Sequence, residues 1–426
     1  MRNNFPENFL WGASTSAHQV EGNNTGNDWW AWEQAGNTRP SGRACDHYNR
    51  YGEDFALAGK LGHNAHRLSL EWSRLEKQQD AWDTGEWDHY KRVLDTLISL
   101  DIEPVLTLHH FTIPLWLSDK GGFLWEGSVN AFSRFAAKAV RELGSRVKYW
   151  ITINEPNILA TLSYYFGEWP PAHRDFNELL TALNNLLKAH SAAYEHMREE
   201  ALQGKDVKNP AIGIAKAVTA FHPCSALSAR DRFCAHMRNR FHNHAFISSA
   251  IRGRSFLPGH KGEKLKRKNC LDFIGLNYYF RQFIHSDGPL RKNPFGEVCD
   301  PRHHHDSGPL TDMGWEIYPP GIYETVKSLS AYGLPLMIAE NGLATEDDTV
   351  RQKYIKDHLS EISKALSKGF PVTGYFHWSL MDNFEWAHGY SKKFGLIEVD
   401  FDTQERKIRD SGRYYASLIR SVRGEQ

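Results

Sequence analysis

The stretch KYWITINEPNILA, residues 148–160, combines a core strand with an end that should resist burial. Residues 149–153 are all β-branched or aromatic, which is typical of a buried strand. The run then reaches Asn154 and Glu155, whose side chains are costly to desolvate without partners. Pro156 follows and has no N–H to continue a ladder of strand hydrogen bonds. The polar end of this strand therefore needs a structural or functional reason.

The rest of the chain repeats the pattern of a short apolar run followed by a longer amphipathic stretch. Eight strand–helix repeats predict parallel strands joined by helical crossovers, and eight is the number that closes a (β/α)8 TIM barrel. We therefore predict an α/β fold with one barrel domain spanning residues 1–426. The polar stretch 285–312 is predicted to be a long loop before the seventh strand. The eight apolar runs are 9–17, 65–72, 103–111, 148–155, 209–221, 271–280, 334–341 and 372–380.

Polar or aromatic residues end most of these runs. In a TIM barrel the carboxyl ends of the strands form the active-site face, so a ring of such residues from distant parts of the chain indicates a site. Adjacent strand residues point to opposite faces, so only one of His109 and His110 can face it. The ring comprises Gln19, Glu21, the two histidines, Asn154, Glu155, Asn277, Tyr279, Glu340, Asn341, Trp378, Glu385 and Trp386.

Two carboxylates stand out in the ring, Glu155 after the fourth run and Glu340 after the seventh. A pair of carboxylates on either side of a glycosidic bond can hydrolyse it, one as a proton donor and the other as a nucleophile. Arg67 could hold one of the pair as the anion, while tryptophan rings and groups such as Gln19 and Glu385 could bind a sugar. The alternative is structural, because a lone glutamate at a strand end is more often a surface or ion-paired residue. These residues alone leave the two interpretations evenly balanced.

Composition excludes several other classes of protein. The formal charge of +0 gives no general attraction to nucleic acid or to an anionic membrane. No apolar run is long enough to span a bilayer, and the first residues do not have the pattern of a signal peptide. Five cysteines, an odd number without a CxxC pair, favour free thiols in the cytoplasm. The HHH run at 303–305 is more typical of a solvated loop than of a metal site, and no GxGxxG motif is present, so no metal or cofactor is predicted.

The motifs, taken in order along the chain, resemble those of the family 1 glycoside hydrolases, the β-glucosidase and β-galactosidase group. The resemblance covers essentially the whole chain and is specific because eight motifs occur in the family's order. These are FLWGASTSAHQVEG, AHRLSLEWSRLE, LTLHHFTIPLWL, TINEPN, DFIGLNYY, MGWEIYPPGIY, IAENG and GYFHWSLMDNFEWAHGYSKKFGLIEVDF.

The resemblance implies a retaining, exo-acting β-glycosidase on a (β/α)8 barrel that cleaves small β-glycosides. It implies that Glu155 is the acid/base and Glu340 the nucleophile. Arg67 and Tyr279 would contact the nucleophile, with Asn277 nearby, and Trp378 would be the stacking platform for the sugar. The remaining glycone contacts implied by the resemblance are Gln19, His110, Asn154, Glu385 and Trp386.

The chain also departs from the family pattern. Ala339 stands where the family commonly has Thr, Lys393 where Arg is usual, and residues 74–83 lack the family's Pro and Gly. These differences concern loops and outer subsites. Glu385 would repel a sugar 6-phosphate, so unphosphorylated substrates are expected.

Two rival functions and several properties stay open from the sequence. One rival is a catalytically silent sugar-binding relative, which would typically lack one of the two glutamates. The other is a metal-dependent hydrolase, for which only His110 is well placed. The preferred glycone (glucose, galactose or fucose), the aglycone and the oligomeric state are also undetermined, and a homo-oligomer is compatible with the sequence.

Overall fold

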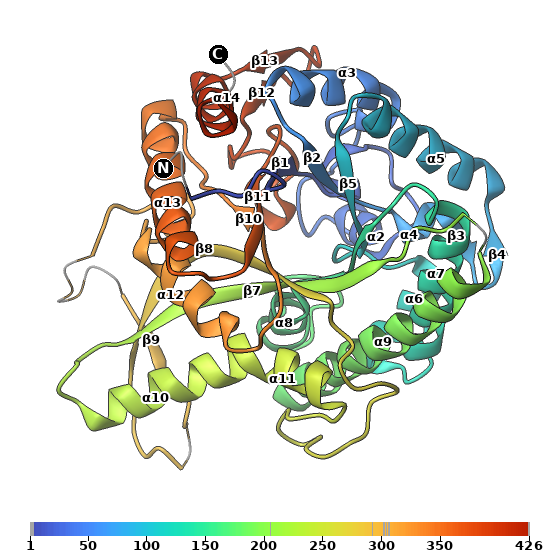
Figure 1. Cartoon of the computed structure of the whole chain (residues 1–426). Coiled ribbons are helices and arrows are strands. Elements are labelled where there is room, and N and C mark those ends of the chain that lie inside the picture. Colours follow the sequence, from blue (N-terminus) through green and yellow to red (C-terminus); the bar gives the residue numbers. More distant parts are fainter. Residues whose placement is uncertain are drawn as a thin grey trace.

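A closed ring of eight parallel strands forms the centre of the computed structural model, which describes residues 4–204, 206–291, 293–300, 303, 305 and 307–424 (Figure 1). The strands follow the order β10-β11-β1-β2-β5-β6-β7-β8, and an additional pairing of β10 with β8 closes the ring. Their bounds are β1 Leu10–Ser14, β2 Ala65–Ser69, β5 Glu103–His109, β6 Tyr149–Asn154, β7 Ala211–Pro223, β8 Phe273–His285, β10 Leu336–Asn341 and β11 Val372–Trp378.

Helices surround the barrel and cover the outer faces of the strands (Figure 1). Several begin at an aspartate whose carboxylate accepts hydrogen bonds from first-turn N–H groups, as Asp83, Asp175 and Asp347 do. The longer helices are α3 His47–Lys60, α5 Thr84–Ser99, α7 Ser128–Leu143, α9 Phe176–Gln203, α10 Ala229–Asn239, α11 Ala245–Arg252, α12 Pro320–Ser330, α13 Asp348–Ser367 and α14 Asp410–Arg423. Shorter elements are α1 Ala17–Val20, α2 Asp28–Gln34, α4 Trp72–Leu75, α6 Leu115–Ser118, α8 Pro156–Thr161, the 3-10 turns Gly122–Leu124 and Trp386–His388, and the π-helical turns Leu162–Phe166 and Arg240–His244.

Two apolar layers stabilise this arrangement. A large outer core lies between the strands and the helices, and a small inner cluster fills the barrel. Because successive strand residues alternate in direction, every second side chain of a strand can contribute to the inner cluster. Its members are Ala65, Val105, Ile151, Ala215, Phe273, Met337, Ala339 and Phe376. The inner cluster closes the barrel below the polar ring, so the barrel is a packed core and not a channel.

The barrel prediction is confirmed, and one barrel strand begins in each predicted run, although β7 and β8 extend beyond theirs. The prediction of an unbroken loop over 285–312 is wrong. Strand β8 extends to His285, and β9 (Glu297–Cys299) pairs with it in antiparallel orientation, as Phe283 and Cys299 illustrate. This pairing satisfies backbone groups that an isolated loop would leave to solvent. Residues 292, 301, 302, 304 and 306 of the stretch lie outside the described residues.

Two further hairpins were not predicted. They are β3 Glu76–Gln78 with β4 Ala81–Trp82, and β12 Ile397–Val399 with β13 Arg406–Ile408. Their strands are two or three residues long, which is too short for a period-2 pattern to be visible in the sequence.

Candidate active site

The end of strand β6 is built so that the chain turns sharply at Glu155. Asn154 is the last strand residue, and Glu155 adopts a left-handed backbone conformation with φ 43°. Its N–H donates to Ala215 O at 2.7 Å, and Pro156 starts helix α8. A glutamate in this region of φ/ψ space is strained, and strained residues persist where the surrounding structure holds them, often at functional sites.

Glu340 of strand β10 is held at both carboxylate oxygens. Arg67 Nη1 donates to Oε1 at 2.5 Å, and Tyr279 Oη donates to Oε2 at 2.6 Å. Arg67 is itself fixed, because Nη2 donates to Asn154 Oδ1 at 2.7 Å and Nε donates to Thr107 Oγ1 at 3.2 Å. Glu340 and Arg67 are both buried. A buried carboxylate with a guanidinium and a hydroxyl donor is stabilised as the anion.

The environment of Glu155, unlike that of Glu340, favours the protonated form of the carboxyl. Burial, followed by the negative charge of Glu340, raises the pKa of Glu155 to about 8. Asn277 Nδ2 donates to Glu155 Oε1 at 2.8 Å and offsets part of this effect. At neutral pH Glu155 therefore holds a proton. Two carboxyls with opposite protonation states are the arrangement that acid and nucleophile roles require.

Lys216 is a buried residue of this region that the sequence reasoning missed. It lies on strand β7, and its Nζ donates to Ala217 O at 3.0 Å. Burial lowers the pKa of Lys216 well below its ordinary value, and the charge of Glu155 opposes that shift. The sequence feature that could have identified Lys216 is its position inside the apolar run NPAIGIAKAVTAF, where a charged side chain is unusual.

A third carboxyl, Glu385, lies beside the same site. Gln19 Nε2 donates to Phe384 O at 2.9 Å and to Glu385 Oε2 at 3.3 Å. Burial and the charge of Glu340 raise the pKa of Glu385 to about 8, while its bonds with Trp378 and Gln19 oppose the rise. Hydrogen-bonding groups from the start and the end of the chain therefore meet at this rim.

Aromatic rings complete the rim around His110. The imidazole of His110 lies nearly parallel to Trp378 (ring centroids 5.8 Å apart) and to Trp386 (6.2 Å apart). Its Nε2 is 3.2 Å from Asn154 Nδ2. His110 Nδ1 and Asn277 Oδ1 are buried and bond to none of the described residues. Buried polar atoms of this kind are normally satisfied, so these two are available to a polar ligand.

Three residues of the predicted ring lie elsewhere. His109 packs edge-on against Phe123 and Phe132, on the helix side of its strand. Asn341 donates to Tyr278 O and to Tyr354 Oη, 2.7 and 2.8 Å away. Both therefore have structural roles, because their contacts are with these groups and not with the two glutamates.

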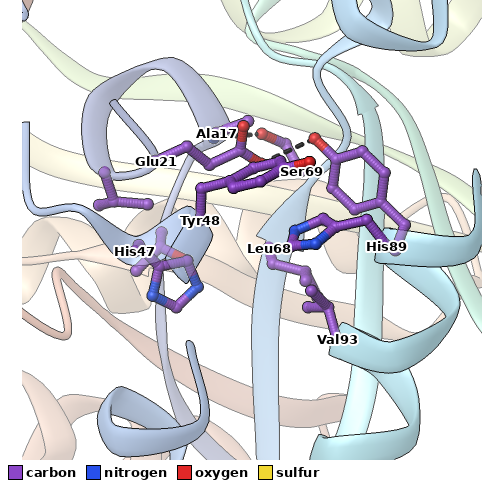
Figure 2. Close-up of a pocket in the computed structure, with 11 residues that line it drawn as sticks. Ala17, Glu21, His47, Tyr48, Leu68, Ser69, His89 and Val93 are labelled. Atoms are coloured by element: carbon purple, nitrogen blue, oxygen red, sulfur yellow. Dashed lines mark hydrogen bonds between the residues drawn. The ribbon is translucent and has the colours of Figure 1, made fainter. Parts of the chain in front are cut away.

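Glu21 is the third residue outside the site. Figure 2 shows it beside a small cavity lined by residues that include Tyr48, Ser69 and His89. Arg74 Nε and Tyr90 Oη donate to its carboxylate, at 2.9 and 2.7 Å. The cavity has a volume of about 10 Å³ and so has room for at most one water molecule. It cannot accommodate a sugar, and Glu21 is a structural ion-pair residue.

The assembled site can perform acid- and nucleophile-assisted bond cleavage. Glu340 provides an ionised oxygen, Glu155 provides a proton, and amide, imidazole and indole groups surround them. Carboxyls in these two states, next to flat apolar rings and amides, suit a pyranose ring and its glycosidic bond.

The comparisons with known proteins agree with this geometry. The model of Glycosyl hydrolase family 1 matches residues 1–423. The chain is 35% identical to beta-glucosidase A of Thermotoga maritima, over 98% of each chain. It is 30% identical to a beta-galactosidase of Pyrococcus woesei, over 98% of this chain and 96% of the relative.

Solved structures give the same result. A beta-glycosidase from Pyrococcus horikoshii superposes with a TM-score of 0.91 and 39% identity, covering 99% of this chain and 96% of the other. A family 1 β-glucosidase from Thermotoga maritima in complex with isofagomine lactam has a TM-score of 0.89 and 33% identity, covering 98% and 99%. Among the described residues, no helix of the chain combines the length and apolar character needed to cross a membrane.

Proposed function

The chain belongs to glycosyl hydrolase family 1, and on that premise we propose that it is a retaining, exo-acting β-glycosidase. It removes terminal non-reducing β-D-glucosyl residues and also accepts β-galactosides and β-fucosides. The names of its relatives support the first two activities, since they include both β-glucosidases and a β-galactosidase. Its partners are small β-glycosides: disaccharides, oligosaccharides and aryl glycosides.

The contrast between the two glutamates carries the proposal. Glu340 is held as an anion by Arg67 and Tyr279, and Glu155 keeps a proton because its pKa is raised to about 8. In the first step a Glu340 oxygen attacks the anomeric carbon and forms an ester bond. The bond between that carbon and the leaving oxygen breaks, and the leaving oxygen takes the proton of Glu155.

The second step reverses these roles. Glu155, now ionised, accepts a proton from a water molecule whose oxygen attacks the anomeric carbon. The ester bond breaks, and Glu340 recovers its carboxylate. Two inversions at one carbon give net retention of the β configuration.

We assign the sugar-binding roles to residues at the rim. Gln19, His110, Asn154, Glu385 and Trp386 contact the glycone hydroxyls, and Trp378 packs against the apolar face of the ring. The hydrogen bonds and ring stacking that connect these residues support the assignment. Asn277 orients Glu155, and Tyr279 and Arg67 position Glu340.

Glu385 accounts only in part for the expected preference for unphosphorylated sugars. Because the pKa of Glu385 is raised to about 8, this residue is largely neutral at pH 7 and repels a phosphate less than the sequence suggested. The anionic Glu340 contributes to that raised pKa, and it would also act against a phosphate dianion. We therefore still propose neutral glycosides as substrates.

A panel of nitrophenyl β-glycosides, ranked by kcat/KM, tests the activity and the glycone preference. Proton NMR of the sugar released first tests the mechanism, and we expect the β anomer before mutarotation mixes the anomers. Early appearance of the α anomer would contradict the retaining mechanism. Sugar binding without turnover of any glycoside would indicate a catalytically silent relative instead. The cytoplasmic location stays a prediction of the sequence, and the oligomeric state stays undetermined by it.

A further inference from the structure

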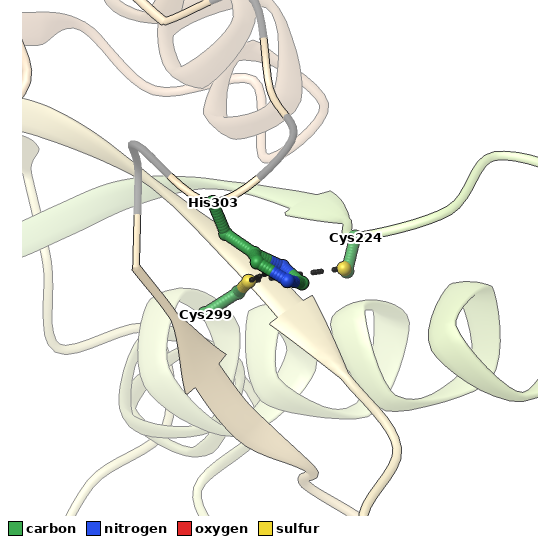
Figure 3. A group of neighbouring side chains, drawn as sticks. All are labelled: Cys224, Cys299 and His303. Carbon is green, nitrogen blue, oxygen red and sulfur yellow. Dashed lines mark hydrogen bonds between the residues drawn. The ribbon is translucent and has the colours of Figure 1, made fainter.

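Two cysteines and a histidine, side chains that bind soft or borderline metal ions, lie close together beside the antiparallel pair β8–β9. Cys224 follows strand β7, Cys299 ends strand β9, and His303 comes four residues later (Figure 3). The backbone N–H of Cys224 donates to Ile284 O at 2.7 Å, which fixes it against β8. The cluster thus joins segments 75 residues apart in the sequence. None of its members belongs to the glutamate site, so metal binding there does not depend on the proposed function.

Two distances within this cluster have the size that a tetrahedral metal site requires. Cys224 Sγ lies 3.8 Å from Cys299 Sγ, and Cys299 Sγ lies 3.6 Å from His303 Nδ1. The ligand atoms of all three residues lie within 4.8 Å of one another. Zinc bonds of about 2.3 Å to sulfur and about 2.0 Å to nitrogen, at tetrahedral angles, separate two sulfurs by about 3.8 Å and sulfur from nitrogen by about 3.6 Å.

A disulfide is a poorer description of the same pair. The sulfur atoms of a disulfide are about 2.0 Å apart, and the observed separation of 3.8 Å is far greater. A divalent cation between two sulfurs this close would bind both as thiolates.

We propose that Cys224, Cys299 and His303 form a binding site for a thiophilic divalent cation of the zinc type. Two thiolates and one imidazole provide three ligands, and water can occupy the fourth position. The cation would tie β9 and the segment after it to the end of β7. The cation would stabilise the fold and take no part in the reaction. This proposal differs from the sequence prediction that the chain binds no metal. The sequence signal was the spacing C-x3-H from Cys299 to His303, but its partner Cys224 is visible only in the fold.

Cobalt titration of the whole chain, reduced and freed of metal by chelation, tests the site directly. We expect one equivalent of Co²⁺ to bind, with a thiolate-to-cobalt charge-transfer band in the near ultraviolet and strong visible bands of tetrahedral Co²⁺. Zn²⁺ should displace the cobalt and remove both signals, because zinc binds such sites more tightly. Failure of the reduced wild-type chain to develop these bands would overturn the proposal.

Variants locate the site. Cys224→Ser, Cys299→Ser and His303→Gln should each weaken Co²⁺ binding by about 100-fold, because each removes a direct ligand. His305→Gln is the matched imidazole control, since the His305 ring stacks flat on Phe283, with ring centroids 3.7 Å apart. Cys234→Ser is the matched thiol control, because Cys234 packs near Ile284 but lies outside the trio. Both controls should keep the wild-type spectrum.

Thermal unfolding provides a second readout. Zn²⁺ should raise the Tm of the wild type and of both controls, and should leave the Tm of Cys299→Ser unchanged. Circular dichroism before each titration shows whether a variant is folded. Cobalt bands that persist in all three ligand variants, or that vanish in both controls, would place the metal elsewhere and refute the site.

Discussion

Arg67 and Glu340 form a buried ion pair in which Nη1 of the arginine lies 2.5 Å from Oε1 of the glutamate. The same guanidinium donates to Asn154, the residue before Glu155, so one side chain connects the ends of β2, β6 and β10. In the proposed mechanism Arg67 is a positioning residue, because it contacts Glu340 directly and fixes the strand end that carries Glu155.

Arg67→Lys should lower kcat by about 100-fold, because an ammonium cannot reproduce the four directed hydrogen bonds of the guanidinium and the pre-organised charge at Glu340 is lost. Arg74→Lys is the matched control, since Arg74 pairs with Glu21 in a similar buried site away from the two glutamates. Steady-state kinetics should show a loss of kcat only for Arg67→Lys, whereas both variants should lose thermal stability. Equal losses of kcat in the two variants would show that the effect is merely structural.

Glu340→Ala should reduce activity by about four orders of magnitude on every substrate, because no other group is placed to attack the anomeric carbon. Glu155→Ala should impair disaccharides most, since a dinitrophenolate leaves without a proton. With this activated substrate the covalent intermediate should accumulate, because the base for the second step is missing.

Azide separates the two roles, because it attacks without a base. The Glu155 variant should be accelerated and give the β-glycosyl azide, whereas the Glu340 variant could give only the α product. Anomeric coupling constants distinguish the adducts. An α adduct from the Glu155 variant together with a β adduct from the Glu340 variant would reverse the two roles.

The rate should fall as the pH rises through about 8. The raised pKa of Glu155 keeps its proton below that value, and the acid is lost as the proton dissociates above it. A profile of kcat/KM against pH, measured with a disaccharide, should therefore show a basic limb near pH 8. Glu155→Gln, measured on a dinitrophenyl glycoside, should lack that limb. Persistence of the limb in this variant would assign it to another group.

Glu385 should reduce the stability of the folded chain as the pH rises. Its pKa is raised from 4.5 to about 8. Between these two pH values the carboxyl is ionised in the unfolded chain but protonated in the folded one. The unfolded state then binds fewer protons, and the free energy of unfolding falls with rising pH.

Glu385→Gln removes this titration, so the Tm of the variant relative to the wild type should be higher at about pH 9 than at about pH 5. Scanning calorimetry at a fixed rate measures the difference. The same variant should lose about 100-fold in kcat/KM, because an amide cannot reproduce the hydrogen bonds that a carboxyl group makes with the sugar hydroxyls. A Tm difference that is independent of pH would contradict the assigned shift.

Exhaustive EDTA treatment should leave the initial rate unchanged at temperatures well below unfolding, since the proposed steps use only carboxyls and water. Removal of a cation from the Cys224 cluster should lower the Tm without changing kcat. A large loss of rate that a divalent ion restores would instead favour a metal-dependent hydrolase.

The eight-fold alternation of apolar runs and amphipathic stretches, together with the motif order, predicted the barrel and singled out the pair of glutamates from sequence alone. This works because a strand buried on both sides gives a continuous apolar run, and because barrel closure brings the ends of distant strands to one rim. A ring of polar strand ends could therefore be predicted without coordinates.

Tertiary structure decided which polar side chains enter the site. Irregularities in the strand pairing occur between Ile151 and Asn154 and between Ile338 and Glu340. Such shifts re-aim side chains that strict alternation would misplace, and no local pattern marks them. The structural role of Asn341 and the cluster around Cys224 also depend on contacts between distant segments. The sequence by itself specified the barrel strands and the family, whereas only the packing of strand on strand set the direction of each side chain and joined groups that are remote along the chain.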